Sequence, residues 1–178
     1  MKIAFCSIAL LLLTLPVFSQ SKEKIDELKE EAEAAKSALM EANPEIKEFF
    51  DSAAGYVIFP NVGKGGFVIG GAAGSGILYE NGKQVGYANL KELNIGLQAG
   101  GQAVIEAIFF ETPETLEKFK GSEFSFNAGL SAVALKEGES FNARYTEGVA
   151  VFMHTKGGLM AEASVGGQKF KYKPFDKM

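Results

Sequence analysis

The sequence contains very little of several residue types on which functional sites often depend. Among its 178 residues it has one cysteine, one histidine, one arginine and no tryptophan. These counts exclude an internal disulfide, a thiolate zinc site and the usual histidine zinc sets. Nucleic-acid binding needs clustered lysine and arginine, whereas this chain carries 18 basic against 22 acidic residues. We therefore expect no nucleic-acid partner, no metal and no cofactor.

The sequence also lacks catalytic motifs. It contains no Gly-x-Ser-x-Gly elbow, and its histidine, His154, shares an expected strand face with Ala150 and Phe152. The carboxylates show no calcium-loop spacing. The glycine-rich stretch 65–76 matches neither a dinucleotide fingerprint nor a Walker loop. We therefore predict a protein that is not an enzyme.

The first nineteen residues have the pattern of a signal peptide. Lys2 precedes an apolar run from Ile3 to Leu15, and residues 17–19 place a small side chain where signal peptidase cuts. We therefore expect a leader over 1–19 and an exported protein, periplasmic or secreted, that starts at Gln20. A retained membrane anchor is the alternative, although the run is short against about 30 Å of hydrocarbon.

Charge and glycine content divide the rest of the chain into two parts. Residues 20–51 hold five lysines and ten acids, whereas residues 52–178 hold twelve charges of each sign. All 21 glycines lie at or after Gly55, where about one residue in six is glycine against a usual ~7%. We expect an N-terminal helical segment over 20–54 and a β-rich body over 55–178, which together form one folded domain.

The N-terminal segment has helical periodicity. Its apolar residues recur at three- and four-residue steps and define one narrow stripe. They are Ile25, Leu28, Ala32, Ala35 and Leu39. Asn43 suits a helix N-cap and Pro44 a first helical position, so a second helix is expected there. We expect this helical pair to pack on its own domain. The alternative is a membrane or partner helix, but membrane-surface helices favour lysine and arginine on the polar face, which is acidic here.

The first part of the body predicts short β-strands. The run 56–59 is β-branched and aromatic, and we expect it to end at Pro60. The runs 76–79 and 85–90 flank Asn81-Gly82, which is a strong hairpin turn. We therefore expect one short strand followed by a hairpin.

The second part of the body predicts further strands and one helix. Apolar and polar residues alternate over 124–134, which is typical of one strand with a single buried face. The runs 149–154 and 159–165 repeat this pattern around a turn at 156–158. A helix over 112–120 is expected between the two groups of strands, with a threonine N-cap and a first-turn proline.

Glycine is unusually frequent inside the predicted strands. The stretch 65–76 has too many glycines for a flat sheet and fits bulges, sharp bends or close sheet contacts. We therefore predict an α+β fold. Its body is a glycine-rich, strongly curved antiparallel β-sheet or barrel, with an N-terminal helical pair and one further short helix.

Several ordered blocks of the sequence resemble the SYLF domain family. These blocks are YVIFPNVGKGGFVIGG at 56–71, GSG at 74–76, GLQAGGQ at 96–102 and LEKF at 116–119. The resemblance covers roughly residues 50–168 and implies a lipid-binding module. Eukaryotic members bind phosphoinositides, and yeast endocytic members also bind actin. Because an exported bacterial-type chain does not meet actin, the expected partner is anionic phospholipid or a membrane surface.

The C-terminal end of the chain offers a basic surface for such binding. Lysines and aromatics alternate there, so an extended chain places Lys169, Lys171 and Lys173 on one face. Lys64 and Lys156 each stand beside a double glycine in an expected turn and would extend this lipid-binding patch. The alternative is a soluble edge strand whose lysines discourage edge pairing.

A second candidate site is a row of polar side chains. Gln98, Gln102 and Glu106 fall four residues apart, so in a strand they share one face. Inside a barrel they would need hydrogen-bond partners, and they would either satisfy bent backbone or line a polar cavity of headgroup size. The alternatives are a solvated outer face or a structural network.

These patterns favour a non-catalytic lipid-binding module that acts at a membrane surface in the cell envelope. The alternative is a protein-interaction or envelope-scaffold module without a lipid ligand, whose partner meets the acidic helix. Attachment through lysines should require anionic lipid and weaken with salt. A protein partner should be captured without lipid.

Overall fold

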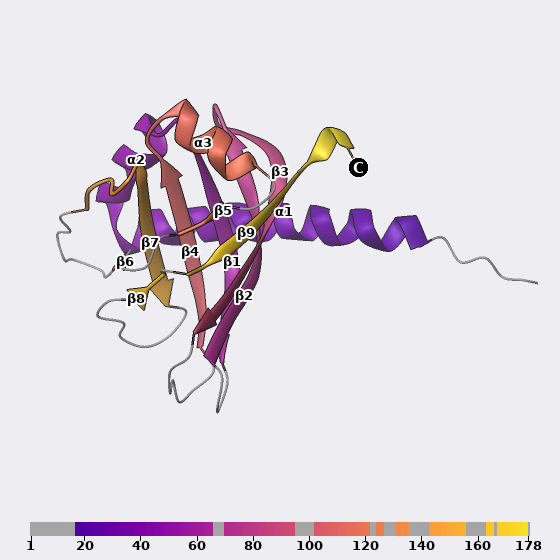
Figure 1. The fold of residues 1–178 in the computed structure, drawn as a ribbon. Helices are drawn as coiled ribbons and strands as arrows, with labels where there is room; N and C mark the ends of the chain where they lie inside the picture. Colours follow the sequence, from indigo (N-terminus) through magenta and orange to yellow (C-terminus); the bar gives the residue numbers. More distant parts are fainter. Residues whose placement is uncertain are drawn as a thin grey trace, which may run out of the picture.

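The computed structural model describes residues 17–65, 70–94, 102–121, 124–126, 131–135, 143–155, 163–165 and 167–177. Its helices are α1 (Val17–Ala42), η1 (Pro44–Ile46), α2 (Lys47–Ser52), α3 (Pro113–Lys120) and η2 (Phe175–Lys177). Its strands are β1 (Gly55–Gly65), β2 (Gly70–Glu80), β3 (Lys83–Asn94), β4 (Gln102–Phe110), β5 (Phe124–Ser125), β6 (Ser131–Ala134), β7 (Val149–Thr155), β8 (Ala163–Ser164) and β9 (Lys169–Pro174). In the described residues these strands form one sheet in the order β5-β9-β3-β2-β1-β4-β7-β6-β8 (Figure 1).

The N-terminal segment folds into the expected helices. α1 buries Ala32, Ala35 and Leu39 along one side. The Asn43 side chain accepts a hydrogen bond from the Glu45 N–H (2.9 Å) and caps the following turn. That turn is 3₁₀ and passes directly into the short α2. Among the described residues, no helix is long and apolar enough to cross a membrane.

Strand β1 does not end at Pro60, so this prediction is wrong. The strand continues through the proline, and its register with β2 shifts between Ile58 and Gly63. Its register with β4 shifts between Phe59 and Val62. Proline has no N–H to donate, and a bulge leaves one residue out of the ladder, so the strand accommodates Pro60 at the bulge.

The hairpin of β2 and β3 is confirmed. Asn81 and Gly82 have φ angles of 51° and 72°, the left-handed pair that such a two-residue turn requires. Both strands extend well beyond the expected runs. Glycine permits close packing in β2, because a Cβ at Gly76 would lie 2.5 Å from the Ile58 carbonyl oxygen of β1.

The alternating run over 124–134 is not a single strand, so this prediction is also wrong. β5 pairs with β9 at one edge of the sheet, whereas β6 pairs with β7 and β8 toward the other edge. Alternation shows which residues share a face but does not show which strand lies alongside. β5 ends six residues before β6 begins, so the curled sheet brings these two strands within about 22 Å of each other.

Two further details depart from the expected antiparallel arrangement. β6 pairs with β7 in parallel, while the other named strand pairs are antiparallel. The expected turn at 156–158 lies outside the described residues, and β8 pairs with β6 instead of β7. The sheet is therefore mixed at this edge.

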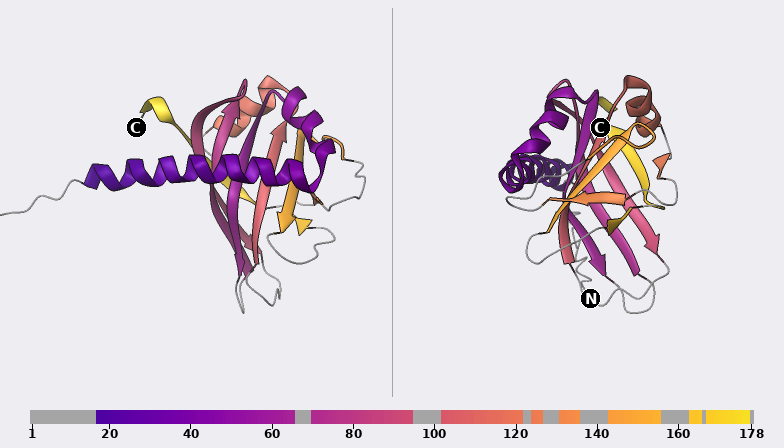
Figure 2. Two further views of the ribbon diagram at one scale, coloured as in Figure 1. Left: turned by 180° about the vertical axis from the view of Figure 1, so that it is seen from behind. Right: turned by 90° about the vertical axis from the view of Figure 1, so that its left-hand side faces the viewer.

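The curled sheet buries apolar side chains on both faces. α3 closes the inner face with Leu116 and Phe119, and the Thr112 hydroxyl caps this helix by accepting from the Thr115 N–H (3.3 Å). The other inner-face residues include Val57, Phe59, Leu78, Leu90, Ile108, Val151 and Phe170. α1 and α2 cover part of the outer face (Figure 2). The structure confirms the α+β fold with a strongly curved sheet.

Candidate functional site

The three lysines of β9 lie on one exposed face. Lys169, Lys171 and Lys173 are exposed, whereas Phe170 is buried and Tyr172 is half-buried. Successive side chains of a strand point to opposite faces, so the lysines point outward and the aromatics inward. The alternation expected from the sequence is confirmed.

A fourth lysine joins this surface from the neighbouring strand. Lys91 of β3 is exposed and pairs directly with Lys169 in antiparallel register. Residues opposite each other in such a pair share a face, with Cβ atoms about 4.5–5.5 Å apart, and like charges so placed are destabilising. The register therefore places these two lysines side by side on one exposed face. We call Lys91, Lys169, Lys171 and Lys173 the lysine face.

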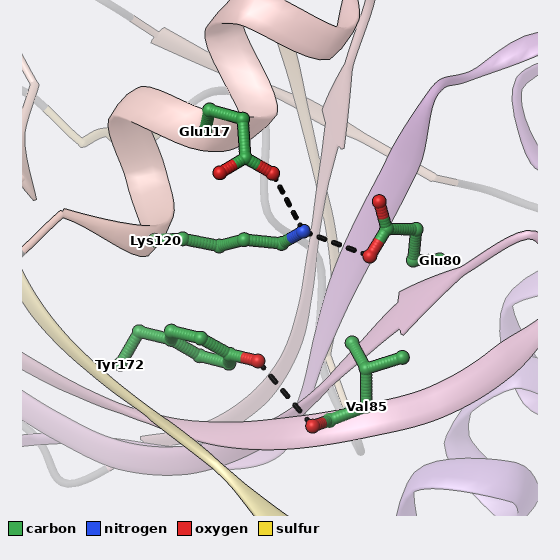
Figure 3. Close-up of polar contacts among 5 residues, drawn as sticks. All are labelled: Glu80, Val85, Glu117, Lys120 and Tyr172. Carbon is green, nitrogen blue, oxygen red and sulfur yellow. Dashed lines mark hydrogen bonds and ion pairs between the residues drawn. The ribbon is translucent and has the colours of Figure 1, made fainter.

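The position of β9 depends on a glycine in β3. A Cβ at Gly86 would lie 2.5 Å from both the Lys173 carbonyl oxygen and a Tyr172 ring carbon. The Tyr172 hydroxyl donates a hydrogen bond to the Val85 carbonyl oxygen (3.3 Å; Figure 3), and burial raises the pKa of this tyrosine. The missing side chain at Gly86 thus lets Tyr172 anchor the inner side of β9 while the lysines face outward.

An ion-pair network braces the same region. Lys120 of α3 lies 2.8 Å from carboxylate oxygens of Glu80 in β2 and Glu117 in its own helix (Figure 3). Desolvation alone would lower the pKa of Lys120, but the hydrogen bonds and charges of Glu117 and Glu80 outweigh it and raise the pKa. This ammonium group is committed to structural contacts, so we do not include it in the lysine face.

The other two predicted basic residues are not placed beside the lysine face. Lys64 lies in β1, and not in the expected turn, opposite Ala72 of β2 and Gln102 of β4. β2 and β3 separate β1 from β9 in the sheet. Lys156 lies outside the described residues. The order of strands, which local patterns do not reveal, therefore keeps Lys64 away from the β9 lysines.

The predicted polar row is described in part. Glu106 is completely buried on the inner face of β4 and accepts a hydrogen bond from the Gln168 amide (3.2 Å), which is also completely buried. A buried carboxylate needs such donors. Gln102 begins β4, and Gln98 lies outside the described residues. The structure places Glu106 in a buried polar network, while its role in a headgroup-sized cavity stays a prediction.

Sequence reasoning missed Lys91 and Gln168. The alternation of Lys91 with the buried Ala88 and Leu90 is visible in the sequence, but the pairing of β3 with β9 is not. Gln168 follows Gly167, whose φ of 88° marks a turn and not a periodic element. Both residues acquire their roles through contacts with distant parts of the chain.

No family model matches the chain. The chain is similar to Beta cell expansion factor A from Aeromonas veronii, with 28% identity over 141 residues. The match covers 78% of this chain and 53% of the relative, so the chain spans about half the length of the curated relative that it matches.

Proposed function

We propose that the chain is a non-catalytic lipid-binding module that attaches to anionic phospholipid surfaces in the cell envelope through the lysine face. The observation that carries this proposal is the direct pairing of exposed Lys91 with exposed Lys169, on a surface that Lys171 and Lys173 extend. An anionic surface would relieve the repulsion between these charges. The resemblance of the sequence to the SYLF family, whose eukaryotic members bind phosphoinositides, supports the same function.

The lysine face suits a surface better than a single headgroup. Alternate residues of a strand are about 6.7 Å apart, so the lysines of β9 extend over about 13 Å. Lysine is a flexible point charge without the planar fork of arginine, which favours contact with several phosphates over stereospecific recognition. Each basic residue near an anionic surface contributes about 1 kcal/mol, so four would give roughly 4 kcal/mol, screened by salt within about 8 Å.

Vesicle flotation tests this proposal. The exported protein, with its N-terminus read by mass spectrometry, is mixed with phosphatidylcholine vesicles that contain rising fractions of phosphatidylglycerol. We expect binding that needs phosphatidylglycerol and weakens between about 0.05 M and about 0.5 M salt. The triple variant Lys169→Gln, Lys171→Gln, Lys173→Gln should lose about 3 kcal/mol, which is more than about 100-fold in partitioning.

A second triple variant controls for net charge. Lys22→Gln, Lys24→Gln, Lys118→Gln removes three exposed lysines from α1 and α3. It should bind nearly as well as the wild type, and circular dichroism should show that both variants are folded. Equal losses in the two triple variants, or salt-insensitive binding to neutral vesicles, would contradict the proposal.

A protein-interaction or envelope-scaffold function is the second candidate. The N-terminal part of α1 extends past the sheet in Figures 1 and 2, and its acidic residues Glu23, Asp26, Glu27 and Glu30 are exposed. This surface would attract a basic partner protein. Failure of flotation, together with lipid-free capture of a basic envelope protein that is lost when these four acids are changed to glutamine, would favour this function.

A further inference from the structure

A pocket lies between α1 and the outer face of the sheet, on strands other than those of the lysine face. Its volume is about 430 Å³, which is within the range of small-molecule sites. The helix contributes Glu31 and three alanines to its lining. β1 contributes Pro60 and Asn61, and β4 and β7 contribute Ile105 and His154. The site thus combines an apolar wall with a few polar groups.

Two features of the sequence create this space. On the helix, Ala34, Ala35 and Ala38 follow Glu31 at three- and four-residue steps, so one side of α1 offers methyl groups there. In the sheet, the register of β1 shifts around Pro60, and such a bulge bends the strand. Small side chains beside a bent strand leave this space next to the packed contact of α1 with the sheet.

Contacts beside the pocket fix α1 on the sheet. The Lys36 ammonium donates a hydrogen bond to the Tyr56 hydroxyl (2.7 Å). It also lies 5.0 Å from the Phe50 ring centroid and 5.7 Å from that of Tyr79. The Tyr79 hydroxyl donates a hydrogen bond to the Glu33 carboxylate (2.9 Å). Burial is the main cause of the raised pKa of Tyr79. These contacts hold α1 against β1 and β2.

One part of the lining is polar and carries negative charge. The Asn61 amide donates a hydrogen bond to the Glu31 carboxylate (3.2 Å) and so holds it beside the pocket. His154 Nδ1 lies 3.4 Å from the Leu135 carbonyl oxygen. In the tautomer that carries its hydrogen on Nδ1, the ring donates to that oxygen and Nε2 is an acceptor. These groups suit a ligand that is positively charged and donates hydrogen bonds.

We propose that this pocket binds a small organic ammonium compound with a short apolar chain. The ammonium group pairs with Glu31, and the chain lies against the alanines and Ile105. A carboxylate ligand would be repelled by Glu31, and an alcohol would lack the charge-assisted hydrogen bond. The described residues bring together no group of three or more His, Cys, Asp or Glu side chains that could hold a metal ion, so the cation proposed is organic. This inference does not depend on the proposed lipid function.

The single histidine allows a direct test. In the untagged exported protein, His154 gives the only imidazole signals in the NMR spectrum. The protein is titrated with n-hexylammonium, n-hexanol and hexanoate, and binding is followed by these signals and by calorimetry. We expect hexylammonium to move the His154 signals and to bind at least about tenfold more tightly than the other two compounds.

Two matched variants locate the charge that is responsible. Glu31→Gln keeps the shape and an acceptor for Asn61, and it should weaken hexylammonium binding about tenfold without changing hexanol binding. Glu30→Gln removes an adjacent exposed acid outside the lining and should bind like the wild type. Equal hexylammonium affinity in wild type and Glu31→Gln, equal affinity for hexanol and hexylammonium, or stationary His154 signals would overturn the proposal.

The ammonium group has two natural sources, a free amine or an aminophospholipid headgroup. Monomeric dihexanoyl phosphatidylethanolamine is compared with the phosphatidylcholine of the same chain length. Tighter binding of the ethanolamine lipid, lost in Glu31→Gln, would assign a lipid headgroup. Binding of hexylammonium together with equal, weak binding of both phospholipids would assign a free amine.

Discussion

Replacement of Lys91 by glutamate should stabilise the protein in solution while it weakens attachment to anionic membranes. Lys91 and Lys169 are exposed and directly opposite, so Lys91→Glu converts a like-charge pair into an opposite-charge pair. Opposite pairs contribute roughly 0.2–1 kcal/mol, and like pairs cost similar amounts. For these exposed side chains we expect a net gain of about 0.5–1 kcal/mol at low salt. In a chain of this size, that gain raises Tm by about 1–4 °C.

The same substitution changes the membrane-binding surface by two charge units. It removes one basic group and adds one acidic group, each worth about 1 kcal/mol at an anionic surface. The loss of about 2 kcal/mol corresponds to roughly 30-fold weaker partitioning to phosphatidylglycerol vesicles. Stability and membrane binding are therefore expected to change in opposite directions.

Thermal unfolding by circular dichroism and vesicle flotation measure the two effects. The matched control is Lys24→Glu, which changes the net charge equally at an exposed position of α1. It should leave Tm and flotation close to those of the wild type. High salt should reduce the stabilisation by Lys91→Glu, because exposed charges are screened. A lower or unchanged Tm at low salt, or an equal loss of flotation in the control, would refute the reasoning.

Two further substitutions test the contacts that hold β9 and α3. Gly86→Ala should lower the free energy of unfolding in urea by about 1–3 kcal/mol, because its Cβ would lie 2.5 Å from the Lys173 carbonyl oxygen. Gly63→Ala, whose Cβ would be 4.0 Å from its nearest neighbour, should cost less, and equal costs would contradict the close-contact argument. The pKa of Lys120 is raised in the folded protein, so protonated Lys120 adds to the free energy of unfolding. This stabilisation is complete below the unfolded-state pKa of about 10.4 and disappears as pH rises through the folded-state pKa. The stability difference between wild type and Lys120→Met should therefore shrink above about pH 10.4, and a constant difference would exclude the linkage.

Features that are determined by residues close together in the chain could be predicted from the sequence. The cap at Asn43 and the Asn81-Gly82 turn are each complete within a few residues, so their patterns are sufficient. Pro60 shows the limit of such reasoning, because a bulge is defined by the strands on both sides of it. The run 124–134 shows the same limit, because its two ends pair with different strands far away in the chain.

The candidate sites likewise combine features that one strand determines with features that require distant parts of the chain. Alternation alone predicts that Lys169, Lys171 and Lys173 share a face, because it is a property of one strand. The like-charge pair on this surface also needs Lys91. Only the register of β3 with β9 shows that Lys91 lies opposite Lys169. The pocket beside Glu31 needs still more, since it exists because a helix face rich in alanine crosses a bent strand.

The buried pair of Glu106 and Gln168 connects the two sites that the sequence indicated. Gln168 directly precedes Lys169, and its amide reaches Glu106 on the inner face of β4. If β9 slipped by one residue, every one of its side chains would move to the opposite face. The lysines would then enter the apolar interior in place of Phe170, and the buried carboxylate would lose this hydrogen bond, two changes that are each costly. The inner polar pair and the inner aromatics thus favour the same register, the one in which the lysines face outward.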